Sequence, residues 1–486
     1  MAACISRLLV VFVVSVLLRA SQIEDCCCDT ETVSENNQEF LNEILTVLRK
    51  RTFFRIFKVD IYKPCKLWPD NTLCFKPTCS VTQCCEEDIP QKWRAMEKAQ
   101  AYNMPVDLFV SDTFDHWNNV DEDQWVSHSA NQDQMIYIDL ERNQDGYTGY
   151  KGEEAGRIWR AIYEAKNLLY RNVDDKSKHL YEREDRVLYR LLSGFHTLTT
   201  CMVFANWPLP DNPQEYGPNL QLYEKVLHGH QDWIQNLYFG FVFLLRAINK
   251  ASTMLKEYDM NTGNAADDAM TMGLMLYLLQ TDFIRTQCNH LNSFDESMMF
   301  QEERLLIRDN FRNVFRNISE IIDCVGCEKC KLHAKVEVLG LGTALKVLFT
   351  KDILSADMFE RNEILALIVT LGKYSDAIQF IEEMERQIEV NKMKANIQGY
   401  VDIDNERKER EQQDQLQEAH MNQQQEFEGL IDKTFRHLFE NETMDGCEEW
   451  KSFCTASDDH GRSEDAQKQQ IAISICDLYQ EFCAKS

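Results

Sequence analysis

The sequence predicts a mostly helical protein organised around one large helical bundle. Only 18 Gly and 9 Pro occur among 486 residues, and long stretches are rich in Leu, Glu, Lys and Met, which are strong helix formers. A hydrophobic content of 44% with 10% aromatic residues is enough to bury a large core. We therefore expect a single helical-bundle domain that carries a cysteine-rich loop segment and a helical or disordered C-terminal extension.

Helical periodicity supports this fold class at three places. Residues 156–170 bring five apolar side chains largely to one side of a 3.6-residue period, namely Ile158, Trp159, Ile162, Tyr163 and Leu169. Residues 184–204 and 232–255 are apolar nearly all round, which is typical of helices at the centre of a bundle. Residues 112–145 are polar and acidic without periodicity, so we expect a long surface loop there.

The two ends of the chain differ in composition from the middle. Residues 1–20 combine a basic residue with an apolar run and small residues, which predicts a secretory signal peptide, with an uncleaved anchor as the alternative. Residues 385–428 predict a solvated helix or a disordered linker, and residues 429–486 a cysteine-containing tail. The main domain is then expected over residues 21–384, with its cysteine-rich segment at residues 60–90.

Charge and cysteine content narrow the function. A formal charge of −27 argues against nucleic-acid binding, because a phosphate backbone requires a clustered basic surface. In an oxidising lumen, eighteen cysteines predict a disulfide framework. Removing Cys4 with the signal leaves an odd number, so at least one thiol is free, intermolecular or exchanging. The same secretory route makes the sequons at Asn317 and Asn441 candidate glycosylation sites.

The most informative motif is a run of three cysteines in the middle of the chain, Cys324, Cys327 and Cys330. A Cys-x-x-Cys pair suits redox chemistry when a helix begins there, because the helix N-terminus lowers the pKa of a thiol. The run also resembles part of an iron–sulfur ligand string, but the fourth Cys with a following Pro is missing, and zinc would need a second ligand pair nearby. We therefore predict a redox pair at Cys327 and Cys330, and no metal.

A second pair lies in the cysteine-rich segment, where Cys74 and Cys79 enclose four residues that include Pro77. A disulfide that closes so small a loop gains little loop-closure entropy, so an exposed, exchanging pair is favoured over a small structural staple, which stays the alternative. Two exchanging pairs on one chain suggest a relay from a client to an acceptor. Because cysteine passes electrons to oxygen inefficiently, a flavin or a quinone is implied.

With these motifs, the sequence resembles the endoplasmic reticulum oxidoreductin family of flavin-dependent oxidases over most of residues 25–383. The resemblance rests on many ordered blocks rather than on one motif. These are residues 25–32, residues 53–59 followed by Cys65, Trp68, Cys74, Cys79 and Cys84, residues 147–152 with Trp159, residues 190–196, residues 236–239 and residues 311–349.

The resemblance implies a thiol oxidase that makes disulfides de novo in the lumen of the endoplasmic reticulum, with peripheral membrane association as a further possibility. Protein disulfide isomerase would be the client, Cys74 and Cys79 the shuttle, and Cys327 and Cys330 the pair beside FAD. Oxygen would be the terminal acceptor and hydrogen peroxide the product. Cys65 and Cys324 would form a structural disulfide that pins the shuttle segment.

The resemblance also assigns the flavin contacts, which are Thr148, Trp159, Ser193, His196 and Arg246. Their chemistry agrees with this role, since an indole stacks on rings, hydroxyl and imidazole groups at i and i+3 share a helix face, and a guanidinium pairs with phosphate. From the residues alone, a core Trp, a helix Ser, a satisfied His and a salt-bridged Arg are the favoured interpretations, and only the surrounding family blocks reverse this preference.

Two of the positions at which the sequence departs from the family concern flavin binding. Gly146 and Trp233 stand where family members commonly have arginines that contact the flavin. This difference motivates an alternative function, a catalytically impaired paralogue that binds isomerases or clients through mixed disulfides. A disulfide-rich structural or adhesion protein is a third interpretation, and it predicts that all the cysteines are inert.

Overall fold

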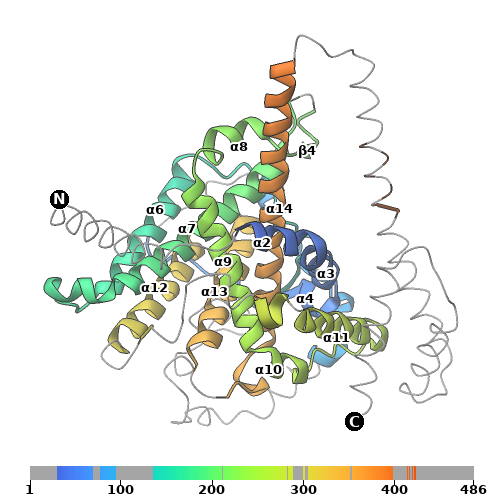
Figure 1. Cartoon of the computed structure of the whole chain (residues 1–486). Helices are drawn as coiled ribbons and strands as arrows, with labels where there is room; N and C mark the ends of the chain where they lie inside the picture. Colours follow the sequence, from blue (N-terminus) through green and yellow to red (C-terminus); the bar gives the residue numbers. More distant parts are fainter. Residues whose placement is uncertain are drawn as a thin grey trace, which may run out of the picture. The chain divides into compact units, whose positions relative to one another are not determined.

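The computed structural model describes residues 30–68, 77–94, 135–210, 212–281, 283–287, 299–300, 305–350 and 353–397, with a few single positions between 413 and 422. The described chain is mostly helical, which confirms the predicted fold class (Figure 1). The predicted signal peptide, Cys74, Asn441 and the tail after residue 428 lie outside the described residues. The division at residues 384 and 428 stays a prediction.

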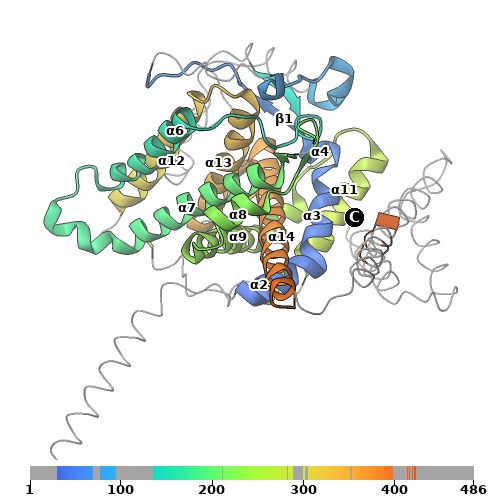
Figure 2. The same cartoon turned by 90° about the horizontal axis from the view of Figure 1, so that it is seen from above.

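Four long helices build the core. They are α7 (Glu182–Ala205), α9 (Gln231–Lys250), α13 (Glu328–Phe349) and α14 (Arg361–Ile397). Helix α9 packs against α7 and α13, while α12 (Leu305–Asp323) packs against α13 and against α6 (Glu153–Ala165) (Figures 1 and 2). Residues 236–248 of α9 are all buried, as expected for a helix that is apolar all round.

Two glycines permit close helix crossings in this core. A Cβ atom on Gly194 in α7 would lie 2.5 Å from the carbonyl oxygen of Asn236 in α9, so only glycine allows these backbones to approach. A Cβ atom on Gly340 in α13 would collide with Thr370 and with the carbonyl of Ala366 in α14. These close crossings join α7 to α9 and α13 to α14, the helices that carry several of the candidate site residues described below.

The predicted helices differ from the observed ones in detail. The helix predicted over residues 156–170 is α6 followed by the 3-10 turn η6 (Lys166–Tyr170). The one predicted over residues 232–255 is α9, which ends at Lys250, followed by the short α10 (Ser252–Glu257). Helix α14 is long and apolar enough to cross a membrane, but 89% of its apolar window is buried inside the protein, as in the core helix of a globular domain.

The predicted surface loop over residues 112–145 is wrong at its end. Strand β2 (Ile136–Asp139) pairs antiparallel with β1 (Ile56–Val59), with Ile56 opposite Asp139. Three of its four residues are buried, because the strand covers apolar side chains of the core. A bridge between Gln83 and Ile138 extends this ladder, and so the cysteine-rich segment is attached to the sheet.

The remaining described elements are short, except for the 16-residue helix α11. They are α2 (Thr30–Asn36), η1 (Asn37–Leu41), α3 (Asn42–Arg49), α4 (Thr52–Arg55), η2 (Pro77–Cys79), η3 (Glu86–Asp88), η7 (Asp175–Tyr181), β3 (Trp207–Pro208), β4 (Tyr216–Gly217), α8 (Leu220–Val226), α11 (Ala265–Gln280), η8 (Phe283–Gln287) and η11 (Ala356–Met358). The chain divides into two compact units, Met1–Asp259 with Leu278–Glu383 and Met260–Tyr277 with Met384–Ser486. Every site residue described below belongs to the first unit.

Candidate active site

The inner cysteine pair lies at the N-terminus of α13. Cys327 is the N-cap residue, and its Sγ accepts a hydrogen bond from the backbone N–H of Cys330 at 3.1 Å. The two cysteines are joined in a disulfide, with 5.2 Å between their Cα atoms. The helix therefore begins where redox chemistry needs it, because a backbone N–H and the helix dipole both favour a thiolate at this position.

A second disulfide joins Cys65 to Cys324, with 4.4 Å between the Cα atoms. Beside it, Lys335 of α13 is fully buried and donates to Asp323, and Lys63 lies 3.8 Å from the same carboxylate. These contacts tie residues 60–68 to the end of α12 and the start of α13. Residues 60–68 are therefore held near the inner pair.

Thr148 lies between the inner pair and the cysteine-rich segment. Its hydroxyl oxygen is 3.1 Å from Sγ of Cys330, and its carbonyl oxygen accepts a hydrogen bond from the hydroxyl of Thr78 at 3.2 Å. The same carbonyl is 3.6 Å from Sγ of Cys79, which is disulfide-bonded. One residue thus touches both Cys79 and Cys330, two predicted members of the relay.

Cys79 itself is only 3% exposed, which differs from the expectation of a pair open to solvent. Its burial follows from the packing of η2 against the N-terminus of α13. A client protein cannot reach a sulfur atom in this position. The described conformation is therefore the one in which the segment faces the inner pair rather than a partner.

Three described cysteines are free thiols, namely Cys84, Cys85 and Cys201. Burial, with the negative charge of Asp139, raises the pKa of Cys84 to about 11. A hydrogen bond to Asp88 raises the pKa of the exposed Cys85, and complete burial raises that of Cys201. All three thiols are protonated at neutral pH, so each is a weak nucleophile in this state.

Three of the five predicted flavin contacts come together on α6 and α7. The rings of Trp159 and His196 stack with centroids 4.0 Å apart, and Nδ1 of His196 lies 3.2 Å from the hydroxyl of Tyr163. Burial lowers the pKa of His196 to about 4, so the ring is neutral at physiological pH. The hydroxyl of Ser193 accepts a hydrogen bond from the side chain of Asn236 at 3.0 Å.

The other two come from other parts of the chain. Arg246 is 8% exposed on α9, which packs against α7, and Thr148 lies with the cysteines. At the positions that depart from the family, Trp233 stacks on His230 at 4.2 Å, and a Cβ atom on Gly146 would meet the side chain of Asn206 at 3.5 Å. Neither position supplies a cation.

These residues fit a flavin dinucleotide in their chemistry. The stacked Trp159 and His196 offer flat surfaces to an aromatic ring, and a neutral imidazole can donate or accept a hydrogen bond. Arg246 is a buried cation of the kind that pairs with phosphate, and Thr148 would meet the ring beside Cys330. The loss of two arginines reduces the number of cations but leaves this set of groups intact.

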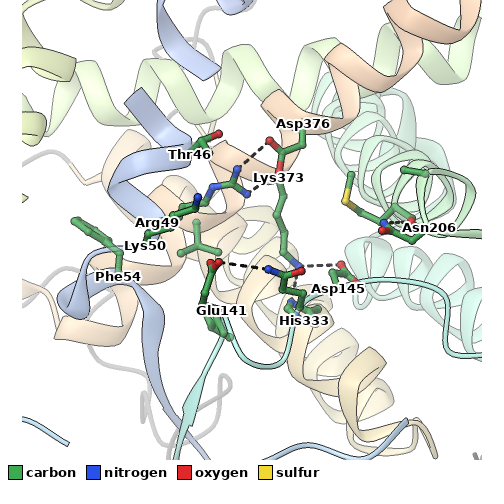
Figure 3. A pocket seen from close by; sticks show the side chains of 15 residues that line it. Thr46, Arg49, Lys50, Phe54, Glu141, Asp145, Asn206, His333, Lys373 and Asp376 are labelled. Carbon is green, nitrogen blue, oxygen red and sulfur yellow. Dashed lines mark hydrogen bonds and ion pairs between the residues drawn. The ribbon is translucent and has the colours of Figure 1, made fainter. Parts of the chain in front are cut away.

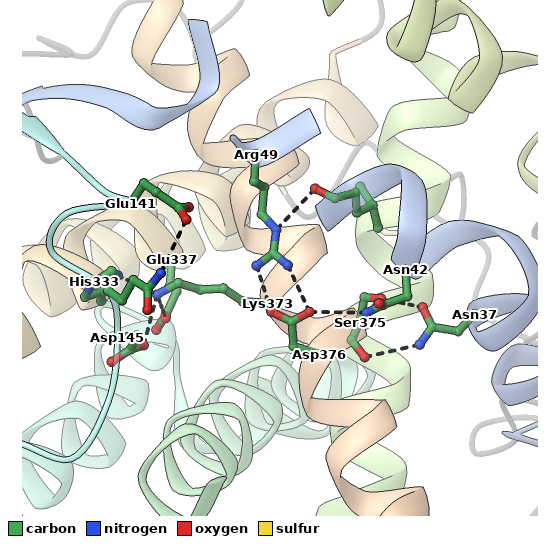
Figure 4. Close-up of polar contacts among 12 residues, drawn as sticks. Asn37, Asn42, Arg49, Glu141, Asp145, His333, Glu337, Lys373, Ser375 and Asp376 are labelled. Atoms are coloured by element: carbon green, nitrogen blue, oxygen red, sulfur yellow. Dashed lines mark hydrogen bonds and ion pairs between the residues drawn. The ribbon is translucent and has the colours of Figure 1, made fainter. Parts of the chain in front are cut away.

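A buried charge cluster lies one turn further along α13, and the sequence did not reveal it. The ammonium group of Lys373 donates to Asp145 at 3.1 Å, to Glu337 at 2.6 Å and to Nδ1 of His333 at 2.9 Å (Figure 4). The Nε2 of His333 donates to the carbonyl of Asn143 at 2.6 Å. Two features of the sequence could have indicated this cluster. One is a lysine inside the apolar run of residues 363–381, and the other is the i, i+4 spacing of His333 and Glu337.

The members of this cluster differ in the direction in which their pKa values are shifted. Burial raises the pKa of Glu337 to about 7, and burial with the nearby Lys373 lowers that of His333 to about 4. Burial alone would raise the pKa of Asp145 and lower that of Lys373, but their mutual attraction reverses both shifts. Lys373 is therefore charged and His333 neutral at neutral pH, and Glu337 keeps its proton to a higher pH than a carboxyl group in water does.

The cluster opens on a cavity of about 400 Å³ between α3, α13 and α14 (Figure 3). Asp145, His333 and Lys373 line its inner end, and Arg49 with Asp376 forms a bidentate ion pair at 2.7 and 2.9 Å on another wall. Apolar side chains make up most of the rest of the lining, and its three basic residues are matched by three acidic ones, so the cavity carries no strong net charge. Among the described residues, no group of His, Cys, Asp and Glu is suited to hold a metal ion.

Comparison with known proteins assigns the family. The sequence profile of Endoplasmic Reticulum Oxidoreductin 1 matches residues 40–381. The chain is 37% identical over 383 residues to endoplasmic reticulum oxidoreductin-2 of Arabidopsis thaliana. The aligned region covers 74% of this chain and 78% of that protein. It is 31% identical to the Ero1-like protein of Drosophila melanogaster, over 74% of this chain and 88% of that protein.

A solved structure shows the same fold. The chain superposes on a double cysteine mutant of S. cerevisiae Ero1p with a TM-score of 0.54 at 22% identity, covering 75% of this chain and 99% of that one. The helical bundle and the cysteine motifs of this chain are consistent with the family of these relatives. The chain belongs to the endoplasmic reticulum oxidoreductin 1 family.

Proposed function

We propose that this family member is a thiol oxidase of the lumen of the endoplasmic reticulum that forms disulfides de novo. The observation that carries the proposal is the position of Thr148, which contacts Cys79 on one side and Cys330 on the other. In the relay, the outer dithiol of Cys74 and Cys79 reduces the inner disulfide. One disulfide forms and one breaks, so two electrons and two protons move inward.

Protein disulfide isomerase is the proposed client. Its reduction potential, roughly −180 mV, lies within the range of the lumenal glutathione poise, so glutathione alone oxidises it only weakly and a separate oxidant is useful. In the described conformation Cys79 is buried, so the outer pair must leave this place to meet a folded client. A small dithiol does not need that movement, because it can approach the inner pair directly.

FAD is the proposed cofactor, held by Thr148, Trp159, Ser193, His196 and Arg246. When bound, it would supply the two-electron acceptor for the inner dithiol and transfer the electrons to oxygen, giving hydrogen peroxide. The aromatic pair of α6 and α7 would orient this acceptor. Through Thr148 the protein places a hydroxyl beside Cys330.

Lumenal residence, a cleaved signal over residues 1–20 and peripheral membrane association belong to the same proposal. Asn317 lies on α12, and the Ser319 of its sequon is 2% exposed. A glycan at Asn317 would therefore have to be added before the helix packs. Asn441 stays a candidate outside the described residues.

The test is oxygen uptake by the purified protein with reduced isomerase and with a small dithiol, alongside its visible absorption spectrum. We expect flavin absorbance, and uptake with both substrates. The double variant Cys74→Ser with Cys79→Ser should nearly lose activity on the isomerase but keep measurable activity on the small dithiol at high concentration. Unchanged isomerase oxidation in this variant would remove the outer pair from the pathway.

The second candidate is an impaired paralogue that binds isomerases or clients by mixed disulfides. Gly146 and Trp233 favour it, because neither supplies the cation common in the family at these positions. A colourless protein that forms mixed disulfides but consumes no oxygen would establish this second function.

A further inference from the structure

The segment that carries Cys79 is fastened by side chains from two regions, the start of α13 and the residues that follow β2. The backbone N–H of Val81 donates to Oε2 of Glu328 at 3.0 Å. The next residue, Thr82, is held through both of its backbone groups by the side-chain amide of Asn143, at 2.6 and 2.8 Å. Residues 81 and 82 are therefore held by a short row of hydrogen bonds, to Glu328 at the start of α13 and to Asn143, which follows β2.

Glu328 has a special place in this row, because it lies between Cys327 and Cys330 and forms the first turn of α13. A carboxylate at a helix N-terminus interacts favourably with the helix dipole, and a hydrogen bond to a charged acceptor is stronger than one between neutral groups. Its partner is a backbone N–H, so the contact fixes the position of the segment without depending on a particular side chain there. The contact is only partly buried, and water can replace it when the segment leaves.

We propose that Glu328 is a positioning residue that holds residues 77–81 against the inner cysteine pair and thereby controls electron transfer from the outer pair to the inner one. This inference rests on the relay proposed above. The controlled step exchanges the inner disulfide for the outer one through a mixed disulfide, and it needs no other oxidant. Glu328 does not touch the reacting sulfur atoms but acts by placing the segment that carries Cys79.

Glu328 is a better test of docking than the other contacts of this segment. Thr148 touches Cys330 and is a proposed flavin contact, so its loss would change several properties at once. Asn143 also binds His333 of the buried charge cluster through its carbonyl. Replacing Glu328 removes one docking contact and leaves the cysteines, Thr148 and the charge cluster in place.

The experiment compares Glu328→Ala, Glu328→Gln and the control Lys329→Ala in the full-length protein. Gln keeps a side-chain oxygen that can accept from Val81 but loses the charge, and Lys329 is the neighbouring residue of the same motif. The first measurement is hydrogen exchange of a peptide that contains Val81 in the oxidised protein. The second is the ratio of isomerase oxidation to small-dithiol oxidation, by oxygen uptake.

We expect Glu328→Ala to speed exchange at Val81 and to lower the activity ratio by about tenfold, which corresponds to losing a hydrogen bond to a charged group. Glu328→Gln should restore most of both properties, and Lys329→Ala should resemble the wild type. Equal loss in Ala and Gln variants would show that the charge acts on the inner thiols, which overturns the inference. An unchanged ratio in Glu328→Ala would also overturn it.

The two proposals fail differently. If the wild type oxidises neither substrate, the proposed oxidase function fails. If the wild type oxidises both while Glu328→Ala keeps the wild-type ratio, the oxidase function stands and only the positioning role is lost. Exchange at Val81 needs neither flavin nor substrate, so it tests the docking contact by itself.

Discussion

Helix α13 carries two polar regions that are built in opposite ways. In its first turn, Cys327 accepts one backbone N–H and Cys330 contacts one hydroxyl. One and two turns later, His333 and Glu337 join Lys373 in a cluster in which all three ammonium hydrogens have acceptors. The difference shows how one helix can carry both an exchanging disulfide and a rigid polar cluster. Few contacts hold the cysteines, so their disulfides can be broken and remade. In the buried cluster every polar group has a partner, so the removal of one group leaves the others unpaired.

The largest effect is expected in the first region. Cys330→Ala should reduce oxygen uptake with a protein dithiol to background, since the inner pair can no longer receive electrons. The free energy of unfolding should fall by about 2 kcal/mol or less, because the disulfide closes a very short loop. Oxygen uptake, flavin absorbance and urea denaturation measure the three properties. Loss of flavin together with stability would instead make these cysteines structural, and normal uptake would contradict the relay.

In the second region, the cluster around Lys373, we expect a large loss of stability. Lys373→Met should lower the free energy of unfolding by about 3–5 kcal/mol, because it leaves the carboxylates of Asp145 and Glu337 buried without their cation. Lys329→Met, on the partly exposed surface of the same helix, should change it by less than about 0.5 kcal/mol. Denaturation by urea measures both variants. A loss below about 1 kcal/mol for Lys373→Met would show that the cluster is not saturated as described.

The pH dependence of stability sharpens the comparison. The pKa of Glu337 is raised in the folded state from 4.5 to about 7, so its contribution to stability is complete below pH 4.5 and is lost as pH rises to about 7. Relative to Glu337→Gln, the wild type should therefore lose stability between these values, with a slope of up to about 1.4 kcal/mol per pH unit. The control Glu141→Gln, at the exposed end of the same cavity, should follow the wild type. Parallel curves for wild type and Glu337→Gln would refute the assignment.

The smallest effect concerns the residue next to Lys373. The hydroxyl of Tyr374 is fully buried and has no hydrogen-bond partner within the described part of the chain. Tyr374→Phe should therefore leave the free energy of unfolding unchanged or raise it by up to about 1 kcal/mol. Tyr258→Phe should lower it by about 1 kcal/mol, since the hydroxyl of Tyr258 donates to the carbonyl of Phe359 at 3.1 Å. Denaturation midpoints compare the two, and a clear loss for Tyr374→Phe would reveal an ordered water at that hydroxyl.

The sequence by itself determined the helical fold class, the central place of α9 and the motif Cys327–Cys330 at a helix start, because periodicity and spacing are local properties. The ordered blocks of residues identified the family, and the comparisons confirmed it.

Only the tertiary structure decided which distant residues meet. Thr148 lies between Cys79 and Cys330, β2 was hidden in a stretch without periodicity, and Lys373 of α14 meets Asp145 and Glu337. The physical reason is that a buried charge or an exchanging sulfur is defined by its partners across the fold. Those partners are 69 residues apart for Cys79 and Thr148, and 228 residues apart for Lys373 and Asp145. No local pattern in the chain encodes such distances.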